Sequence, residues 1–164
     1  HRPTAMLLTV PRLHAMLDAL RTRTVDTSSL RSLQISGSPL TPHRLAEAVE
    51  RLGPVIYQDY GQTEAGLITV LTPDDMAERG TRVLDSVGRA WAGARIEVRD
   101  DSGAEVPPGT TGEIWVHTPA TLTAYRDDPR ETEEVRDDDG WVRTRDLGHL
   151  DADGFLRLTG RSRE

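Results

Sequence analysis

The first part of the chain alternates short apolar runs with segments whose apolar residues recur at helical spacing. Residues 5–10 are almost all apolar, which predicts a buried strand. Pro11 favours the start of a helix directly after that strand. The apolar side chains of this next segment recur every three or four residues: Leu13, Met16, Leu17 and Leu20. A strand followed at once by a helix is therefore expected.

Two more strands are expected at residues 33–37 and 55–57, with a second helix between them. Thr41 is a candidate N-cap, and Pro42 falls at the first helical position. The apolar positions of this helix are Leu45, Val49 and Leu52. Alternation of strand and helix predicts a parallel, doubly wound α/β sheet.

After about Asp75 the pattern changes to short segments in which apolar and polar residues alternate. These segments lie at residues 86–87, 94–98, 113–116, 141–142 and 155–158. Clusters of turn-forming residues separate them, at 100–103, 107–109 and 151–154. The pattern predicts an antiparallel meander or small β-barrel. We therefore expect part of a doubly wound subdomain at 1–75 and a β subdomain at 82–160.

Composition and charge narrow the range of functions. The 164 residues suffice for one domain or two small subdomains, and the net charge of −7 with no basic patch makes nucleic acid an unfavoured partner. The absence of cysteine excludes disulfides and thiolate chemistry and fits a cytoplasmic protein. No apolar run approaches the length of a membrane span, and no leader is recognisable.

All twenty basic residues are arginines, and the chain contains no lysine. A GC-rich genome is the simplest explanation, because it favours arginine codons. The chemical consequence holds whatever the cause. Any mechanism that needs a lysine, such as a Schiff base or a phosphate-binding P-loop, cannot be completed by this chain alone.

The segment at 57–66 concentrates groups that suit a nucleotide. Tyr60 offers a ring for a base, and Gly61 lets the backbone turn without a side chain in the way. Thr63 offers a hydroxyl donor for a phosphate, and Glu64 offers a carboxylate for Mg²⁺. The alternative is a core tyrosine followed by an exposed loop.

Three further segments carry candidate chemistry, each with a plainer alternative. Ser36-Gly37-Ser38 lies at the end of a predicted strand, where parallel sheets bind ligands, although a simple turn explains it equally well. Residues 140–148 contain Asp146, which is otherwise an exposed hairpin aspartate. Residues 151–164 contain a predicted hairpin turn at Asp153-Gly154 and then Arg161. Asp146 and Arg161 are fifteen residues apart, so one hairpin returns them to the same end of a strand pair.

Together and in this order, the four segments resemble the motifs of the adenylate-forming superfamily, which includes acyl-CoA synthetases, luciferases and peptide-synthetase adenylation domains. The resemblance implies that Thr63 and Glu64 are catalytic, with Glu64 as the Mg²⁺ ligand and Thr63 as a donor to the α-phosphate. It implies that ATP or AMP contacts Ser36, Gly37, Ser38, Asp59, Tyr60, Gly61, Gln62, Thr63, Asp146, Leu158 and Arg161.

Within that set, the resemblance implies distinct roles for the residues near the C-terminus. Asp146 accepts hydrogen bonds from both ribose hydroxyls, Leu158 packs near the base, and Arg161 reaches the ribose and the phosphates. Two positions depart from the family pattern. Arg145 stands where glycine is usual, so it is expected either to pair with Asp146 or to force the loop away from a positive φ. Arg163 stands where aspartate or lysine is usual, in a hinge that residues 161–164 would begin.

The chain thus resembles the second half of the large domain of an acyl-CoA synthetase. Two family parts are expected to be missing: an N-terminal half with a phosphate loop ending in Pro-Lys, and a C-terminal lid with a catalytic lysine. The implied reaction joins a carboxylic acid to ATP and then to CoA, and the chain alone is expected to be inactive. Alternatives are a peptide-synthetase adenylation domain, a fatty acyl-AMP ligase, or a non-catalytic nucleotide-binding or interaction module that dimerises through an exposed sheet edge.

Other features support simpler interpretations. The acidic stretches at 137–139 and 151–153 lack the full pattern of a calcium loop, and the five histidines show no metal-binding spacing. His14 and His43 are expected at the surface of helices. Residues 126–139 carry both charge signs and are expected to form a solvent-facing loop. The three tryptophans are expected in the core of the β subdomain.

Overall fold

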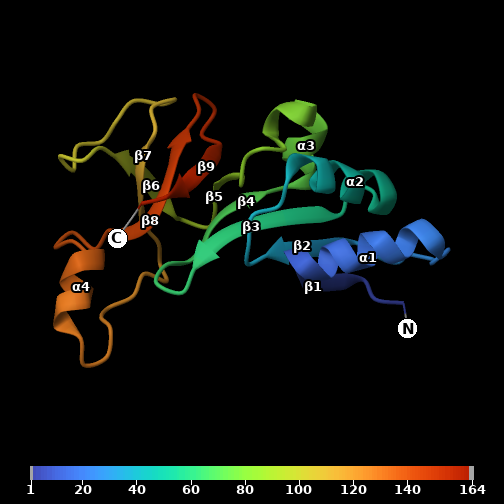
Figure 1. The fold of residues 1–164 in the computed structure, drawn as a ribbon, viewed down its shortest axis with the longest axis horizontal. Helices are drawn as coiled ribbons and strands as arrows, with labels where there is room; N and C mark the ends of the chain where they lie inside the picture. Colours follow the sequence, from blue (N-terminus) through green and yellow to red (C-terminus); the bar gives the residue numbers. More distant parts are fainter. Residues whose placement is uncertain (1, 163–164) are drawn as a thin grey trace. The chain divides into compact units, whose positions relative to one another are not determined.

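The computed structural model describes residues 2–162, and their contacts divide them into two compact units (Figure 1). The N-terminal unit comprises the described residues up to Tyr60 together with Val70–Gly88. The C-terminal unit comprises Gly61–Thr69 and the described residues from Arg89 onward. The subdomains expected at 1–75 and 82–160 differ from these units mainly in the placement of residues 61–69.

The N-terminal unit is built from strands and helices in alternation, as the apolar pattern predicts. Its first three strands, β1, β2 and β3, pair in parallel. The elements up to residue 83 are β1 (Ala5–Thr9), α1 (Val10–Thr22), β2 (Ser32–Ser36), α2 (Pro42–Leu52), β3 (Ile56–Gln62), β4 (Gly66–Leu71), α3 (Pro73–Arg79) and the 3₁₀ helix η1 (Gly80–Val83). With β5 (Arg89–Ala90), the strands form one sheet in the order β1-β2-β3-β4-β5.

Helix α2 shows how the sequence sets the ends of an element. The Thr41 side chain accepts a hydrogen bond from the backbone N–H of Arg44, and Pro42 begins the helix. Gly53 ends it with a φ of 84°, a value that glycine adopts without strain. The side chains that α1, α2 and the strands bury together include Leu13, Leu17, Leu33, Ile35, Leu45 and Ile56. His43 is exposed as expected, but His14 is half-buried, so the expectation that it lies at the surface is wrong.

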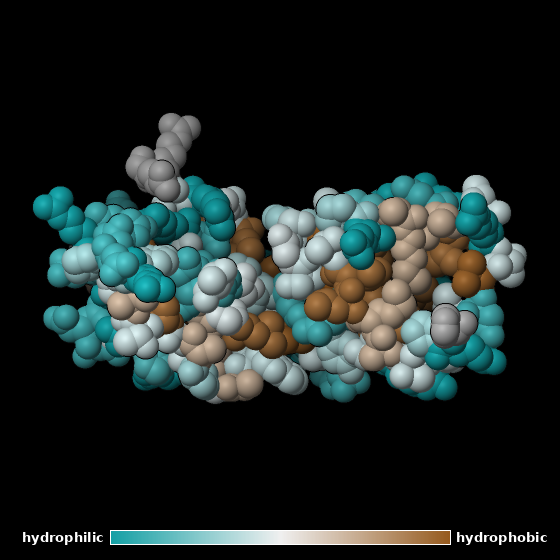
Figure 2. Space-filling model, turned by 90° about the horizontal axis from the view of Figure 1, so that it is seen from below, coloured by the Kyte–Doolittle hydropathy of each residue, from teal (hydrophilic) through white to brown (hydrophobic). Residues whose placement is uncertain are grey.

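Strand β1 was expected to be buried, and that expectation is wrong. It is the end strand of the described sheet, and its residues alternate between exposed and half-buried. Leu7 is 66% exposed. Hydrophobic surface gathers on this part of the molecule in Figure 2, on the right of the view. The apolar run at 5–10 therefore lacks a covering layer on one side within the described residues.

Strand β3 extends five residues beyond the predicted segment, and β4 was not predicted. The two strands enclose the short turn at residues 63–65. Gly61 lies inside β3, so the expectation that it serves to turn the chain is wrong. A Cβ atom added at Gly61 would lie 2.3 Å from the carbonyl oxygen of Gly66, so this position needs glycine because the backbone of β4 approaches it closely.

The C-terminal unit contains an antiparallel meander, one of the two forms that the alternating segments predict. Its strands β6 (Arg95–Arg99), β7 (Gly112–His117), β8 (Val142–Leu150) and β9 (Leu156–Arg161) pair in that order. Its buried side chains include Val98, Ile114, Val116, Val142, Phe155 and Leu156. Trp141 is buried there, whereas Trp91 is exposed, so the expected core position of Trp91 is wrong.

Residues 126–139 were expected to form a loop, but part of this segment is helix α4 (Pro129–Val135). The Asp128 side chain caps the helix by accepting a hydrogen bond from the backbone N–H of Glu131, and Pro129 begins it. Val135 is the buried residue of α4. In residues 2–162, no helix is both long and apolar enough to cross a lipid bilayer.

Candidate functional site

Thr63 and Glu64 lie in the turn that joins β3 to β4, inside the C-terminal unit. A backbone hydrogen bond of 3.2 Å from Ala65 N–H to the Gln62 carbonyl closes this turn. Thr63 is exposed, so its hydroxyl can reach a ligand, whereas Glu64 is half-buried. The turn therefore presents a hydroxyl and a carboxylate in consecutive positions.

A segment distant in the sequence holds Glu64. The Tyr125 hydroxyl donates a hydrogen bond of 2.8 Å to Oε1 of Glu64, and the backbone N–H of Leu122 donates one of 2.7 Å to its carbonyl. Burial and the hydrogen bond to the Glu64 carboxylate raise the pKa of Tyr125 to about 12, because both disfavour the phenolate. Sequence reasoning missed Tyr125, which is 61 residues from its partner and carries no local signal of the contact.

Thr118 fixes the next residue of the same turn. Its buried hydroxyl donates a hydrogen bond of 2.6 Å to the carbonyl of Ala65. The Thr118 backbone N–H in turn donates to the hydroxyl of Thr121 at 2.8 Å. The segment from Thr118 to Tyr125 thus holds the 63–65 turn through a backbone donor and two side-chain donors.

Asp146 and Arg161 pair as the hairpin spacing predicts. They are register partners on β8 and β9, and Nε of Arg161 donates a hydrogen bond of 2.9 Å to Oδ1 of Asp146. Asp146 is only 7% exposed, while the Arg161 side chain is 78% exposed. The Thr144 hydroxyl accepts a hydrogen bond from the Asp146 backbone N–H. The arrangement offers a fixed carboxylate beside a guanidinium that is open to solvent.

Arg145 does not force the backbone out of a positive φ, so that part of the expectation is wrong. Its φ is 61°, a conformation that costs a non-glycine residue about 1–2 kcal/mol. Its guanidinium extends to helix α4, where it pairs with Glu131 at 2.9 Å and with Glu134 at 3.6 Å. The departure from glycine is therefore accommodated by two acidic residues on a neighbouring helix. The other departure, Arg163, and Glu164 with it, lie outside the described residues.

The remaining sequence-predicted site residues divide between the two units. Gly61, Gln62 and Leu158 share the C-terminal unit with Thr63, Glu64, Asp146 and Arg161. Ser36, Gly37, Ser38, Asp59 and Tyr60 belong to the N-terminal unit.

In the N-terminal unit, Ser36 ends β2 and Gly37 follows with a φ of 93°, as a turn at a strand end requires. The amide of Gln34 donates a hydrogen bond to Asp59, and burial raises the pKa of the Asp59 carboxyl despite this bond. Oδ1 of Asp59 is buried and has no hydrogen-bond partner within residues 2–162. Tyr60 is buried as well.

Residues 2–162 contain no group of three or more acidic, histidine or cysteine side chains that could hold a metal ion by themselves. Mg²⁺ is commonly held by one or two carboxylates together with substrate phosphates. Glu64 suits that second arrangement, because Tyr125 engages Oε1 and the carboxylate has a further oxygen. The residues therefore fit Mg²⁺ that arrives with a phosphate ligand.

A family model described as AMP-binding enzyme matches residues 1–126. The chain belongs to the AMP-binding enzyme family. The match covers the N-terminal unit, the 63–65 turn and Tyr125, and it ends before β8 and β9.

Relatives of this AMP-binding chain align along almost its whole length. Medium/long-chain-fatty-acid–CoA ligase FadD8 of Mycobacterium tuberculosis is 39% identical over 164 residues, which is 99% of this chain and 28% of that protein. Indoleacetate–CoA ligase of Aromatoleum aromaticum is 37% identical over 163 residues, 99% of this chain and 31% of that protein. The chain thus spans about 30% of the length of these relatives.

Solved structures of the family share the fold. The amide bond synthetase McbA from Marinactinospora thermotolerans superposes with a TM-score of 0.90 and 42% identity, covering 98% of this chain and 32% of that one. O-succinylbenzoate coenzyme A synthetase (MenE) from Bacillus subtilis, solved in complex with AMP, superposes with a TM-score of 0.83 and 30% identity, covering 98% and 32%. These likenesses show the α/β fold that the sequence predicts.

Proposed function

We propose that this chain is part of an AMP-forming acid–thiol ligase and carries its nucleotide-binding residues. The supporting observation is that the C-terminal unit contains both the Thr63-Glu64 turn and the Asp146–Arg161 pair, each held by hydrogen bonds. The family match and the CoA ligases among its relatives support the same reaction class.

In the proposed reaction, a carboxylate oxygen of the acid attacks the α-phosphorus of ATP. The P–O bond to the β-phosphate breaks, which gives an acyl-adenylate and pyrophosphate. A thiol, which we propose is that of CoA, then attacks the acyl carbonyl and releases AMP. Positioning and charge neutralisation supply most of the catalysis in phosphoryl chemistry of this kind. Mg²⁺, when bound with ATP, would neutralise phosphate charge.

Four side chains have roles in this proposal. Thr63 donates its hydroxyl to the α-phosphate, and Glu64 binds the cation through its carboxylate. Asp146 accepts hydrogen bonds from the vicinal ribose hydroxyls, because the two oxygens of a carboxylate match two donors. Arg161 stays close to Asp146 and has an exposed guanidinium that reaches the nucleotide. We propose that the acyl group is that of a fatty or aryl acid, as the relatives' names suggest.

Pyrophosphate exchange in the longer protein that carries this chain tests the proposal. Asp146→Asn is expected to raise the KM for ATP about tenfold or more, since hydrogen bonds to a charged group contribute roughly 1.5–3 kcal/mol each. Asp101→Asn, in the exposed turn between β6 and β7, is the matched control and should leave the KM unchanged.

The isolated 164-residue chain is expected to give no exchange above the blank, because it contains no lysine to neutralise the developing charge. Exchange by the isolated chain, or an Asp146→Asn variant with the KM of the control, would contradict the assigned roles.

A further inference from the structure

The hydrogen bond from Tyr125 to Glu64 joins two segments that are 61 residues apart in the sequence. Glu64 has three rotatable side-chain bonds, so an unrestrained carboxylate on this turn would sample many orientations. The Tyr125 hydroxyl holds Oε1 at 2.8 Å and so restricts the rotation of the carboxylate. The segment that carries Tyr125 also holds the backbone of the turn. Leu122 N–H donates a hydrogen bond to the Glu64 carbonyl, and the Thr118 hydroxyl donates one to the Ala65 carbonyl.

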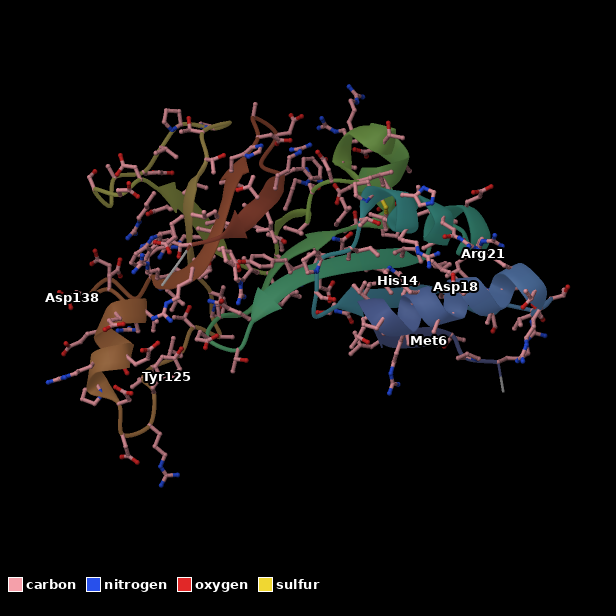
Figure 3. The ribbon with its side chains drawn as sticks, in the orientation of Figure 1. Met6, His14, Asp18, Arg21, Tyr125 and Asp138 are labelled. Carbon is pink, nitrogen blue, oxygen red and sulfur yellow. The ribbon has the colours of Figure 1, made fainter. Side chains whose placement is uncertain are left out.

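Tyr125 is itself held by helix α4, beside which it lies in Figure 3. Its backbone N–H donates a hydrogen bond of 3.0 Å to the hydroxyl of Thr132, one turn into the helix. The same hydroxyl donates to the carbonyl of the N-cap residue, Asp128, at 2.8 Å. The first turn of α4 therefore fixes the backbone position of Tyr125.

Helix α4 is fastened to strand β8 at two places. Arg145, next to the proposed ribose ligand Asp146, pairs with Glu131 at 2.9 Å. Beyond the end of the helix, Arg136 forms an antiparallel bridge with Val142 at the start of β8. A continuous series of contacts thus runs from β8 through α4 and Tyr125 to Glu64, within one unit of the structure.

We propose that Tyr125 is a positioning residue that orients the Glu64 carboxylate toward the metal–nucleotide ligand, and that α4, held to β8 by the Arg145–Glu131 pair, keeps Tyr125 in place. This inference rests on the proposed function, in which Glu64 binds the cation. It also gives Arg145 a role: the arginine links β8, which carries Asp146, to α4, which contacts Tyr125. Groups that orient a metal ligand typically change metal affinity by about 10–100-fold when removed.

Two pairs of variants in the longer protein separate this role from a general effect on folding. Tyr125→Phe removes only the hydroxyl, and Tyr57→Phe, on β3 of the other unit, is its control. Glu131→Gln removes the partner of Arg145, and Glu133→Gln, an exposed residue of the same helix, is its control. Mn²⁺ serves as the metal probe, because its binding in the presence of ATP is followed by paramagnetic resonance without turnover.

Tyr125→Phe is expected to weaken Mn²⁺ binding in the presence of ATP about tenfold or more, and Glu131→Gln to weaken it by a smaller factor. ATP binding without divalent metal should stay as in the parent, because the nucleotide contacts are untouched. Equal Mn²⁺ affinity in Tyr125→Phe and Tyr57→Phe would overturn the proposal. So would a parallel loss of metal-free ATP binding, which would indicate general disruption.

Hydrogen exchange of the peptide that contains Ala65 is a second test of the positioning role, and it does not depend on ligand binding. Tyr125→Phe and Glu131→Gln should exchange faster there than their controls, and equal exchange overturns the positioning role. If the unmodified protein binds neither ATP nor Mn²⁺ with ATP, the proposed function fails. In that case, hydrogen exchange alone tests whether Tyr125 and α4 hold the 63–65 turn.

Discussion

At the residue scale, the carboxylate of Glu47 is the centre of a cluster of arginine side chains. Its side chain is 10% exposed and accepts hydrogen bonds from the guanidinium groups of Arg21, Arg44 and Arg51 at 2.7–3.2 Å. Asp18 extends the cluster by pairing with Arg44 at 2.9 Å, and Figure 3 labels Asp18 and Arg21 on α1. Planar guanidinium groups can share one carboxylate in this way, because each presents several donors in a fixed geometry.

The cluster predicts a pH-dependent contribution to stability. The hydrogen bond from Arg44, followed by that from Arg21, lowers the pKa of Glu47 to about 2, against the opposing effect of burial. A carboxyl whose pKa is lower in the folded chain than in the unfolded one stabilises the fold above the unfolded pKa. That stabilisation is lost as the pH falls from about 4.5 towards 2.

We therefore expect Glu47→Gln to lower the free energy of unfolding at pH 7, and the difference from the parent to shrink near pH 3. Urea titrations at both pH values measure it. Glu50→Gln, an exposed residue of the same helix, is the control and should show no such pH-dependent difference. A Glu47→Gln deficit that is as large at pH 3 as at pH 7 would contradict the assignment.

At the element scale, local patterns predicted the elements whose signals lie within a few residues. Strand β2, helix α2 and the Asp146–Arg161 hairpin follow from apolar spacing and turn residues. Helix α4 was missed because it buries one side chain, Val135, and so shows no apolar periodicity. The contact between Tyr125 and Glu64 could not be predicted, since it depends on how the chain returns after 61 residues.

Helix α3 was missed although its start signal was readable. Thr72-Pro73 repeats the Thr41-Pro42 pattern that identified α2. The structure adds a capping box: the Thr72 hydroxyl accepts from the Asp75 N–H at 3.1 Å, and the Asp75 carboxylate accepts from the Thr72 N–H at 3.0 Å. Two short motifs of the same kind thus begin two helices of the N-terminal unit.

Thr72→Ala is expected to reduce the free energy of unfolding by about 1–2 kcal/mol, because the capping oxygen is lost and Asp75 is buried without one of its donors. Thr72→Ser keeps the oxygen and should recover most of the stability. Chemical denaturation of the three proteins measures the effect. Serine and alanine variants of equal stability would show that the cap contributes nothing.

At the scale of the whole molecule, the chain spans about 30% of the length of its relatives, and one of the two edges of its five-stranded sheet exposes a large apolar side chain. That edge is β1, where Leu7 is 66% exposed. An exposed apolar edge strand is a template for pairing with another chain. The alternative of an interaction module rests on the same feature.

We expect the isolated chain to self-associate in a concentration-dependent way, and Leu7→Lys to reduce the association because a charged residue on an edge strand opposes pairing. Val25→Lys introduces the same charge at an exposed apolar residue outside the strands and is the control. Light scattering over a range of concentrations measures the mass. A chain that stays monomeric throughout, or two lysine variants that behave alike, would refute the expectation.

The pairing of Arg145 with the acidic face of α4 also constrains the order in which this sequence can change. Replacing the arginine by glycine relieves the left-handed backbone, yet it leaves Glu131 and Glu134 without their cation beside a strand that bears Asp146. Neutralising the two glutamates first removes both of these ion pairs and leaves the arginine in its left-handed backbone conformation. Exchange between arginine and glycine at position 145 is therefore expected to accompany changes at Glu131 and Glu134. These three positions are expected to vary together among related sequences.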